Sequence, residues 1–326
     1  MSNHHINRRQ FMVRSAKAGA SIIAACSISY WFYDSAGPGR QTTEAEALQI
    51  PDFSMPELGE RMSIVRGDNR LKTLELALKS VGGLEAFIKK GDRVLLKVNA
   101  AFASAPMLSA TSHPDIVAAL TRLCLKAGAA SVVVADNPIN DPASCFRLTG
   151  IEQAARSAGA TVVLPQNEFF KLFSLPQGQL IRNWPVFFDP LSRVDKIIGT
   201  APVKDHHRSG ASMIMKNWYG LLGGRRNIFH QDIHTIIQEL AMMIKPTLVV
   251  LDGTTTMMHN GPTGGSLSDL KHTHTMIVST DQVAADAYGA GLLDKTVADL
   301  AFIKKADAAG LGTADFRSLN PVMESL

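Results

Sequence analysis

Cysteine is scarce in this sequence, with three in 326 residues, and no two of them form a C-x-x-C pair. Zinc-ribbon sites and Cys-ligated iron–sulfur clusters need several closely spaced cysteines, so we expect neither within this chain. Cys124 and Cys145 could form a disulfide in an oxidising compartment. Because Cys124 falls on the apolar side of an expected helix, we favour a buried free thiol.

Acidic residues are missing from the first 33 positions, whereas Arg8, Arg9, Arg14 and Lys17 all lie there. The formal net charge of the chain is +4, which equals the charge of these four residues. The rest of the chain is therefore close to neutral, and it lacks the clustered basic residues of a nucleic-acid-binding surface. We expect no nucleic-acid partner.

The N-terminus resembles a twin-arginine export signal. Residues 7–12 read NRRQFM, in which two arginines precede a variable, an aromatic and an apolar residue, and a mildly apolar stretch follows from Ala18 to Tyr33. Small residues make this stretch weaker than a membrane-spanning helix. The pattern predicts export by the twin-arginine translocase to a periplasmic or other extracytoplasmic location, with a basic, disordered tail as the alternative.

Three outcomes are open for the end of this segment. Residues 23–26 resemble a lipobox, in which Cys26 would be lipidated after cleavage; cleavage without lipidation and an uncleaved anchor are the other two. Any membrane contact is thus expected only through the N-terminal segment. We predict a signal or anchor over 1–36, a linker rich in glycine, proline and polar residues over 37–61, and an α/β domain over 62–326.

From residue 64 onward, short apolar runs alternate with amphipathic segments. Strands are expected at 94–98, 132–135, 161–164, 196–200, 247–251 and 276–279, and helices at 113–126, 151–158, 232–244 and after Asp281. Near-continuous apolar strands suit a parallel sheet covered on both faces. The alternation predicts an α/β fold with a mostly parallel sheet flanked by helices. One possible form of this fold has two lobes, at about 62–190 and 191–326, with a cleft between them.

Polar side chains follow several expected strands. Asn99, Asp136 and Asp252 each come directly after an apolar run. Ligands of open parallel sheets bind beyond the carboxyl ends of the strands, so we expect these side chains to lie near a ligand. For any one of them, a helix cap or a turn is the simpler explanation.

The chain carries an ordered series of short motifs. They are KVN at 97–99, TSHP at 111–114, AGA at 127–129, VAD at 134–136, PVK at 202–204, MKNWYG at 215–220, KP at 245–246, VLDG at 250–253, GP at 261–262 and DQVAAD at 281–286. Together they resemble the domain of unknown function 362 family. A more remote resemblance, to the N-terminal region of lactate racemase-like proteins, implies a cleft in an α/β fold. Some family relatives add a Cys-rich iron–sulfur module, which this chain lacks.

Histidines gather after residue 200, and His230 and His234 are four residues apart. Gln231 follows His230, so the H-E-x-x-H protease pattern fails, and Asp232 as a helix cap would leave His230 outside the helix. Imidazole and carboxylate groups are common metal ligands. A divalent metal is one interpretation of these residues, and solvated loop histidines are the other; the sequence names no cofactor. The candidate ligands are His230, Asp252 and Asp136.

Two polar pairs, Lys204 with His206 and Lys216 with Asn217, lie in otherwise apolar sequence. Lysines and an amide could hold a carboxylate or phosphate, and His206 could transfer a proton. Solvated lysines are the alternative. The candidate catalytic residues are His206, Lys216 and Lys204, and the candidate substrate-binding residues are Lys97, Asn99, Asn217 and Gly261.

A glycine-rich run, GLLGGRR at 220–226, resembles an anion-binding loop. It lacks both the G-K-[ST] and the G-x-G-x-x-G patterns, so we interpret it as a flexible turn.

Two functional hypotheses follow. The first is an exported enzyme that acts on a small anionic molecule by His/Lys acid–base or metal-assisted chemistry. The second is a non-catalytic ligand-binding or accessory protein of an exported redox system. The sequence alone names neither the reaction nor the substrate.

Overall fold

The computed structural model describes residues 8–9, 12–17, 19 and 48–326. The chain divides into two compact units, Met1–Glu46 and Ala47–Leu326. In the first unit the described residues are helical. The lipobox and residues 37–47 of the expected linker lie outside the described residues, as does part of the twin-arginine pattern, so export stays a prediction. Within the described part of the chain, no helix has the length and apolar character needed to cross a membrane.

The folded unit begins before the predicted boundary at residue 62. Phe53 and Met55 are buried in its core. Phe53 N donates a hydrogen bond to Lys245 O at 3.1 Å, and Thr247 Oγ1 donates to Phe53 O at 2.7 Å. The expected linker over 37–61 is therefore too long, because a few apolar side chains among prolines are enough to attach residues 48–61 to the domain.

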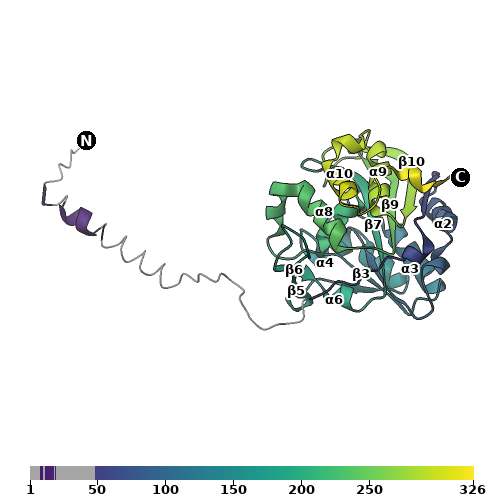
Figure 1. Ribbon diagram of the computed structural model, residues 1–326, viewed down its shortest axis with the longest axis horizontal. Coiled ribbons are helices and arrows are strands. Elements are labelled where there is room, and N and C mark those ends of the chain that lie inside the picture. The colour runs from purple at the N-terminus through teal and green to yellow at the C-terminus, as the bar shows by residue number, and fades with distance from the viewer. Residues whose placement is uncertain (1–7, 10–11, 18, 20–47) are drawn as a thin grey trace. The chain divides into compact units, whose positions relative to one another are not determined.

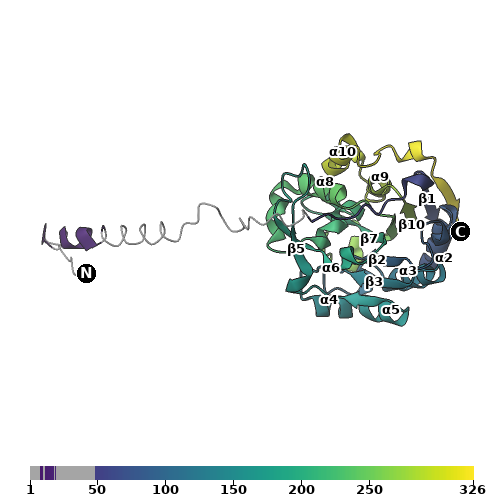
Figure 2. The ribbon, with the colours of Figure 1, turned by 60° about the horizontal axis from the view of Figure 1, so that its bottom comes forward.

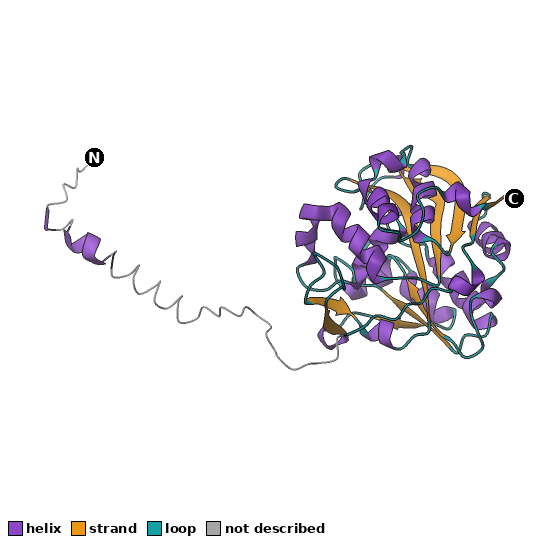
Figure 3. Ribbon diagram, in the orientation of Figure 1, coloured by secondary structure: helices purple, strands orange, loops and turns teal. Residues whose placement is uncertain are grey.

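One nine-stranded sheet forms the centre of the domain (Figures 1 and 3), in the order β11-β1-β10-β9-β7-β2-β3-β4, with β8 paired to β7. Its strands are β1 (Met62–Arg66), β2 (Arg93–Lys97), β3 (Ser131–Ala135), β4 (Thr161–Val163), β7 (Lys196–His206), β8 (Gly210–Ser212), β9 (Leu248–Met257), β10 (Leu270–Ser279) and β11 (Val322–Ser325). From β9 to β4 the neighbours run parallel, whereas β10 is antiparallel to β9 and β1. The predicted α/β fold with a mostly parallel sheet is confirmed.

The alternative of two lobes divided near residue 190 is wrong, because the sheet crosses that boundary. β7, from the second half of the chain, pairs in parallel with β2, from the first half, with Leu96 opposite Ile198. β1 likewise pairs with β10. Residues 47–326 form one compact unit.

Helices cover both faces of the sheet, with α2, α3 and α5 on one side and α8, α9 and α10 on the other (Figure 2). The helices are α2 (Arg70–Ser80), α3 (Pro114–Lys126), α4 (Pro142–Leu148), α5 (Ile151–Ser157), α6 (Asp189–Ser192), α7 (Ile214–Asn217), α8 (Ile233–Met243), α9 (Gln282–Leu292) and α10 (Ala301–Ala308). Leu95 and Ile197 pack into the core on the α8 side, and Leu96 and Ile198 into the core on the α3 side. Because both faces are covered, neighbouring residues along one strand, such as Leu95 with Leu96 and Ile197 with Ile198, are both apolar.

Side chains cap several of these helices. Asp232 caps α8, as expected, and Asp281 caps α9: Asp281 Oδ1 accepts from Val283 N at 2.7 Å. His113 caps α3, where its Nδ1 accepts from Asp115 N. An Ncap residue needs only an acceptor atom near the first free N–H groups, which leaves the Ser112 hydroxyl available elsewhere.

Cys124 and Cys145 are both buried and free, as predicted. Burial raises the pKa of the Cys124 thiol to about 12 and that of Cys145 to about 11. Neither side chain is a thiolate near neutral pH, so neither suits nucleophilic catalysis.

Candidate functional site

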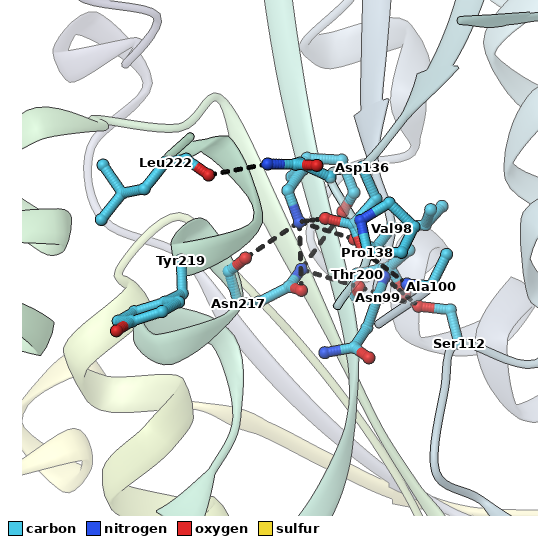
Figure 4. Close-up of polar contacts among 12 residues, drawn as sticks. Val98, Asn99, Ala100, Ser112, Asp136, Pro138, Thr200, Asn217, Tyr219 and Leu222 are labelled. Carbon is cyan, nitrogen blue, oxygen red and sulfur yellow. Dashed lines mark hydrogen bonds and ion pairs between the residues drawn. The ribbon is translucent and has the colours of Figure 1, made fainter. Parts of the chain in front are cut away.

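A buried ion pair lies at the carboxyl ends of β2 and β3 (Figure 4). Lys97 Nζ is 2.7 Å from Asp136 Oδ1, and the two side chains are 0% and 3% exposed. Asp136 Oδ2 accepts a hydrogen bond from Ala100 N at 2.6 Å, and Lys97 Nζ donates to Val98 O at 2.7 Å. A buried ion pair is tolerated when further hydrogen bonds hold the charged groups, and here Asp136 Oδ2 and Lys97 Nζ each form one to the backbone. Asp136 Oδ1 is buried, and Lys97 Nζ is its ion-pair partner.

Asn217 joins this pair to the neighbouring strand. Its backbone oxygen accepts from Lys97 Nζ at 2.9 Å, and its side-chain Nδ2 donates to Thr200 O at 3.1 Å (Figure 4). The prediction that Lys97 binds substrate directly is wrong, because its ammonium is buried and fully used by these contacts. Asn217 lies at the site, but its amide is also engaged by the protein.

Gly220 allows the short helix η5 (Trp218–Leu221) to lie directly against the ion pair. A Cβ atom at this position would lie 1.8 Å from Asp136 Oδ1 and 2.8 Å from Lys97 Nζ. Asn137 N also donates to Gly220 O at 2.8 Å. The run 220–226 is therefore a fixed part of the site and not the flexible turn that we predicted.

A pocket of about 340 Å³ adjoins this layer, and we call it the inner pocket. It is bounded by the ends of β2 and β3, by β7 and α7, and by the short helices η5 and η6 (Arg226–Asp232). Seven of the ten predicted site residues line it, namely Asn99, Asp136, Lys204, His206, Lys216, Asn217 and His230. Lys97, Gly261 and Asp252 do not.

Two buried lysines line the inner pocket. Lys204 Nζ lies 5.1 Å from the ring centre of Phe102, and Lys216 Nζ lies 5.0 Å from that of Tyr219. Burial, with Lys216 nearby, lowers the pKa of Lys204 to about 7; burial, with Arg226 nearby, lowers the pKa of Lys216 to about 8. Among the described residues, neither lysine forms an ion pair with a carboxylate.

Arg226 adds a third buried cation, which the sequence analysis missed. Its Nη1 donates to Tyr219 O and Leu222 O, each at 2.9 Å, and its Nη2 donates to Asn137 O at 2.7 Å and Pro138 O at 2.9 Å. Four carbonyls orient the guanidinium without neutralising it. In the sequence, the glycine-rich run that ends in two arginines indicated a cation in this region. It did not show which of the two arginines lies in the pocket.

His206 is 2% exposed, and its hydrogen bonds fix its tautomer. Its Nδ1 accepts from Arg208 N and Ser209 N, each at 3.2 Å. A ring nitrogen that accepts from two N–H groups carries no proton, so the proton of the neutral ring lies on Nε2. Burial, with Lys216 nearby, lowers the pKa of His206 to about 2. The geometry assigns His206 a hydrogen-bond donor role in place of the predicted proton transfer.

His230 has the opposite tautomer. Its Nδ1 lies 3.2 Å from Tyr219 Oη and 3.2 Å from Asn227 O. Tyr219 Oη gives its own proton to Arg226 O, so both neighbours accept and Nδ1 of His230 carries the proton. Burial lowers the pKa of His230, which keeps the ring neutral with a lone pair on Nε2. Its ring stacks on that of His206, with centres 5.9 Å apart.

Asn99 presents an unsatisfied acceptor at the inner pocket. Its Oδ1 is buried and has no hydrogen-bond partner. Its backbone N donates to Ser112 Oγ at 2.8 Å, and Ser112 Oγ donates to Thr200 O at 3.0 Å (Figure 4). A buried acceptor left unpaired costs about 1–3 kcal/mol, and Asn99 is one of the residues that line the inner pocket.

The predicted metal ligands are not brought together. Asp252 lies inside β9 instead of after it, because the β-branched residues 254–256 continue the strand, and its Oδ2 accepts from Arg70 Nε at 3.1 Å. Asp136 is committed to Lys97. In the part of the chain that the structure describes, no three His, Cys, Asp or Glu side chains are grouped to hold a metal ion. The set His230, Asp252 and Asp136 is wrong, and metal binding stays a prediction.

Gly261 lies against the backbone of β7 and does not line the inner pocket. A Cβ atom there would lie 1.9 Å from Asp205 O, and Gly261 O accepts from His207 N at 3.4 Å. The absence of a side chain lets the loop pack on β7 and brings Pro262 to the wall of the inner pocket.

Fold and site together define a class of protein, a one-sheet α/β domain with a cationic pocket at the carboxyl ends of its parallel strands. The chain belongs to the family described as domain of unknown function (DUF362), whose family model matches residues 94–291. The resemblance inferred from the motifs is confirmed.

The chain is similar to a curated relative and, more weakly, to a solved structure. It is 24% identical over 269 residues to a thylakoid-associated protein of Synechocystis sp., which covers 78% of this chain and 77% of that protein. It is also similar to the lactate racemase apoprotein from Thermoanaerobacterium thermosaccharolyticum, with 11% identity and a TM-score of 0.35 over 63% of this chain. The chain spans 53% of that protein.

Proposed function

We propose that the protein binds a small anionic molecule in the inner pocket and acts on it by proton transfer at His230. The observation that carries the proposal is the pair of buried lysines, Lys204 and Lys216, which line the pocket without a carboxylate partner. Burying an unpaired charge costs several kcal/mol, as an order of magnitude. Such groups are retained where an anion pairs with them, and about 340 Å³ is room for a small one.

The histidines and Asn99 would orient that anion and move a proton. The Nε2–H group of His206 donates a hydrogen bond to the anion, and Asn99 Oδ1 accepts one from a donor group on the same molecule. His230 Nε2 takes a proton from the ligand. Negative charge that develops on the ligand as the proton leaves is stabilised by the ammonium groups already in place.

Inorganic sulfate is a suitable probe of this site, because it keeps two negative charges across the accessible pH range. We expect Lys216→Met to weaken sulfate binding about tenfold or more, which corresponds to the loss of one charge-assisted hydrogen bond. Titration calorimetry on the purified protein measures it. Lys271→Met is the matched control, because Lys271 is an exposed lysine paired with Asp294 away from the pocket. Equal sulfate affinity in both variants would refute the anion site.

The same titration should depend on pH. The pKa values of Lys204 and Lys216 are about 7 and about 8, so sulfate affinity should fall as pH rises through this range and the ammonium groups lose their protons. Stability should change in the opposite direction. An unfolded lysine holds its proton up to about pH 10.5, so the unfolded chain binds more protons and the ligand-free protein gains stability as pH rises. An affinity that is constant with pH contradicts the assignment.

A non-catalytic binding protein is the second candidate, and the fixed donor role of His206 favours it, because a group with a pKa of about 2 exchanges no protons near neutral pH. The variant His230→Gln separates the two candidates. For an enzyme, this variant should keep sulfate affinity and lose turnover of small hydroxy acids and phosphate esters. A wild-type protein that binds these compounds and converts none of them would support the binding role.

A further inference from the structure

A second pocket, of about 720 Å³, shares a wall with the inner pocket, and we call it the outer pocket. Six residues line both, namely Asn137, Ile139, Tyr219, Arg226, Asn227 and His230. A ligand group that reaches His230 in the inner pocket therefore lies beside the outer one.

The two pockets differ in charge. Four cations, Lys204, Lys216, Arg208 and Arg226, line the inner pocket together with one carboxylate, that of Asp136. Beyond the shared wall, none of the residues that line the outer pocket is charged. They are apolar residues with flat or rigid rings, including Phe170, Pro165 and Pro185, together with the neutral amides of Gln166 and Asn167. One pocket thus suits an anion and the other an uncharged group.

The outer pocket also has a smooth wall that is held in place. Phe170 stacks on Phe187, with ring centres 5.3 Å apart and planes at 20°. A Cβ atom at Gly223 would lie 2.6 Å from the Phe170 ring, so only glycine allows the backbone to pack against that ring. Trp184 Nε1 donates to Gly223 O at 3.1 Å and fixes this segment. An aromatic ring pairs favourably with another flat ring in a stacked or edge-to-face arrangement.

We propose that the ligand has two parts, an anionic head in the inner pocket and an uncharged flat ring in the outer pocket. This inference rests on the proposed anion site and adds a specificity element to it. Phe170 and Ile139 are the contacts for the ring, because Phe170 provides an aromatic face and Ile139, at 62% exposure, lies at the wall common to both pockets.

Two organic sulfates of equal charge test the proposal. Methyl sulfate and phenyl sulfate are both monoanions, and they differ in the group that would enter the outer pocket. We expect the purified protein to bind phenyl sulfate about tenfold more tightly than methyl sulfate, as for burial of an aromatic ring. In Phe170→Leu this advantage should fall at least about threefold, with methyl sulfate affinity unchanged, because the flat face is lost and most of the volume is kept.

Two further variants make the test specific. Ile139→Ala alters an exposed side chain that cannot affect folding through core packing, and it should also reduce the phenyl advantage. Leu172→Ala lies on the same strand as Phe170, β5 (Phe170–Phe173), with an exposed side chain outside the pocket, and it should change neither affinity. Equal binding of both sulfates by the wild-type protein overturns the two-part ligand and leaves the anion site standing. Binding of neither, with no binding of inorganic sulfate, overturns both.

Discussion

Gly220→Ala should prevent native folding or lower the free energy of unfolding by about 3 kcal/mol or more, the upper range for overpacking a core. The new methyl group would lie 1.8 Å from Asp136 Oδ1 and 2.8 Å from Lys97 Nζ. Neither group can move aside, because both are buried and held by hydrogen bonds to backbone. Urea denaturation followed by circular dichroism measures the effect.

Gly291→Ala is the control for this experiment. Gly291 lies in α9, and a Cβ atom there would meet nothing within 4 Å. Alanine is a better helix former than glycine, so this variant should gain up to about 1 kcal/mol. If Gly220→Ala unfolds at the same urea concentration as the wild type, η5 does not rest on the ion pair as described.

Lys97→Met should destabilise the protein by about 3–5 kcal/mol, because it leaves the Asp136 carboxylate buried without its partner. The methionine fills most of the lysine volume, so the loss reports charge and hydrogen bonding and not a cavity. The double variant Lys97→Met, Asp136→Asn removes both charges and should recover a large part of the loss. Urea denaturation of the wild type, the two single variants and the double variant gives the coupling energy.

An exposed pair provides the comparison. Arg93 Nη2 lies 2.9 Å from Asp195 Oδ1, a similar distance to that in the buried pair, but the two side chains are 50% and 40% exposed. Arg93→Met should therefore change stability little, since water screens the pair. A double variant at Lys97 and Asp136 that is no more stable than Lys97→Met alone would show that the unpaired carboxylate is not the source of the cost.

Several elements of the fold were predicted correctly from local pattern. The apolar run at 94–98 gave β2, and Asp232 and Asp281 were recognised as helix caps. One error arose because the apolar run alone does not show where strand pairing ends. β9 continues to Met257 because β10 pairs with it that far, and this moved Asp252 from a strand end into a strand.

Part of the site could be predicted from the topology of a parallel sheet. Parallel strands place their carboxyl ends at one edge of a sheet, so polar residues such as Asn99 and Asp136 meet there whatever the details of packing. The apolar neighbours of Lys204 and Lys216 favoured a pocket position without excluding solvated lysines, and the structure buries both side chains. No local signal separates these pocket-lining lysines from Lys97, which is buried in an ion pair beneath the pocket.

By itself, the sequence determined the α/β fold, the sheet with apolar residues on both faces, and the identity of most residues that gather at one edge. Only the tertiary structure decided what each of them does. The proton of His206 lies on Nε2 and that of His230 on Nδ1 because of the acceptors and donors around each ring. Arg226 turns inward because carbonyls from β3's end and from η5 converge on it. Strand and helix patterns depend on neighbours along the chain, whereas charge, tautomer and burial depend on groups that are distant in sequence and meet only in the folded domain.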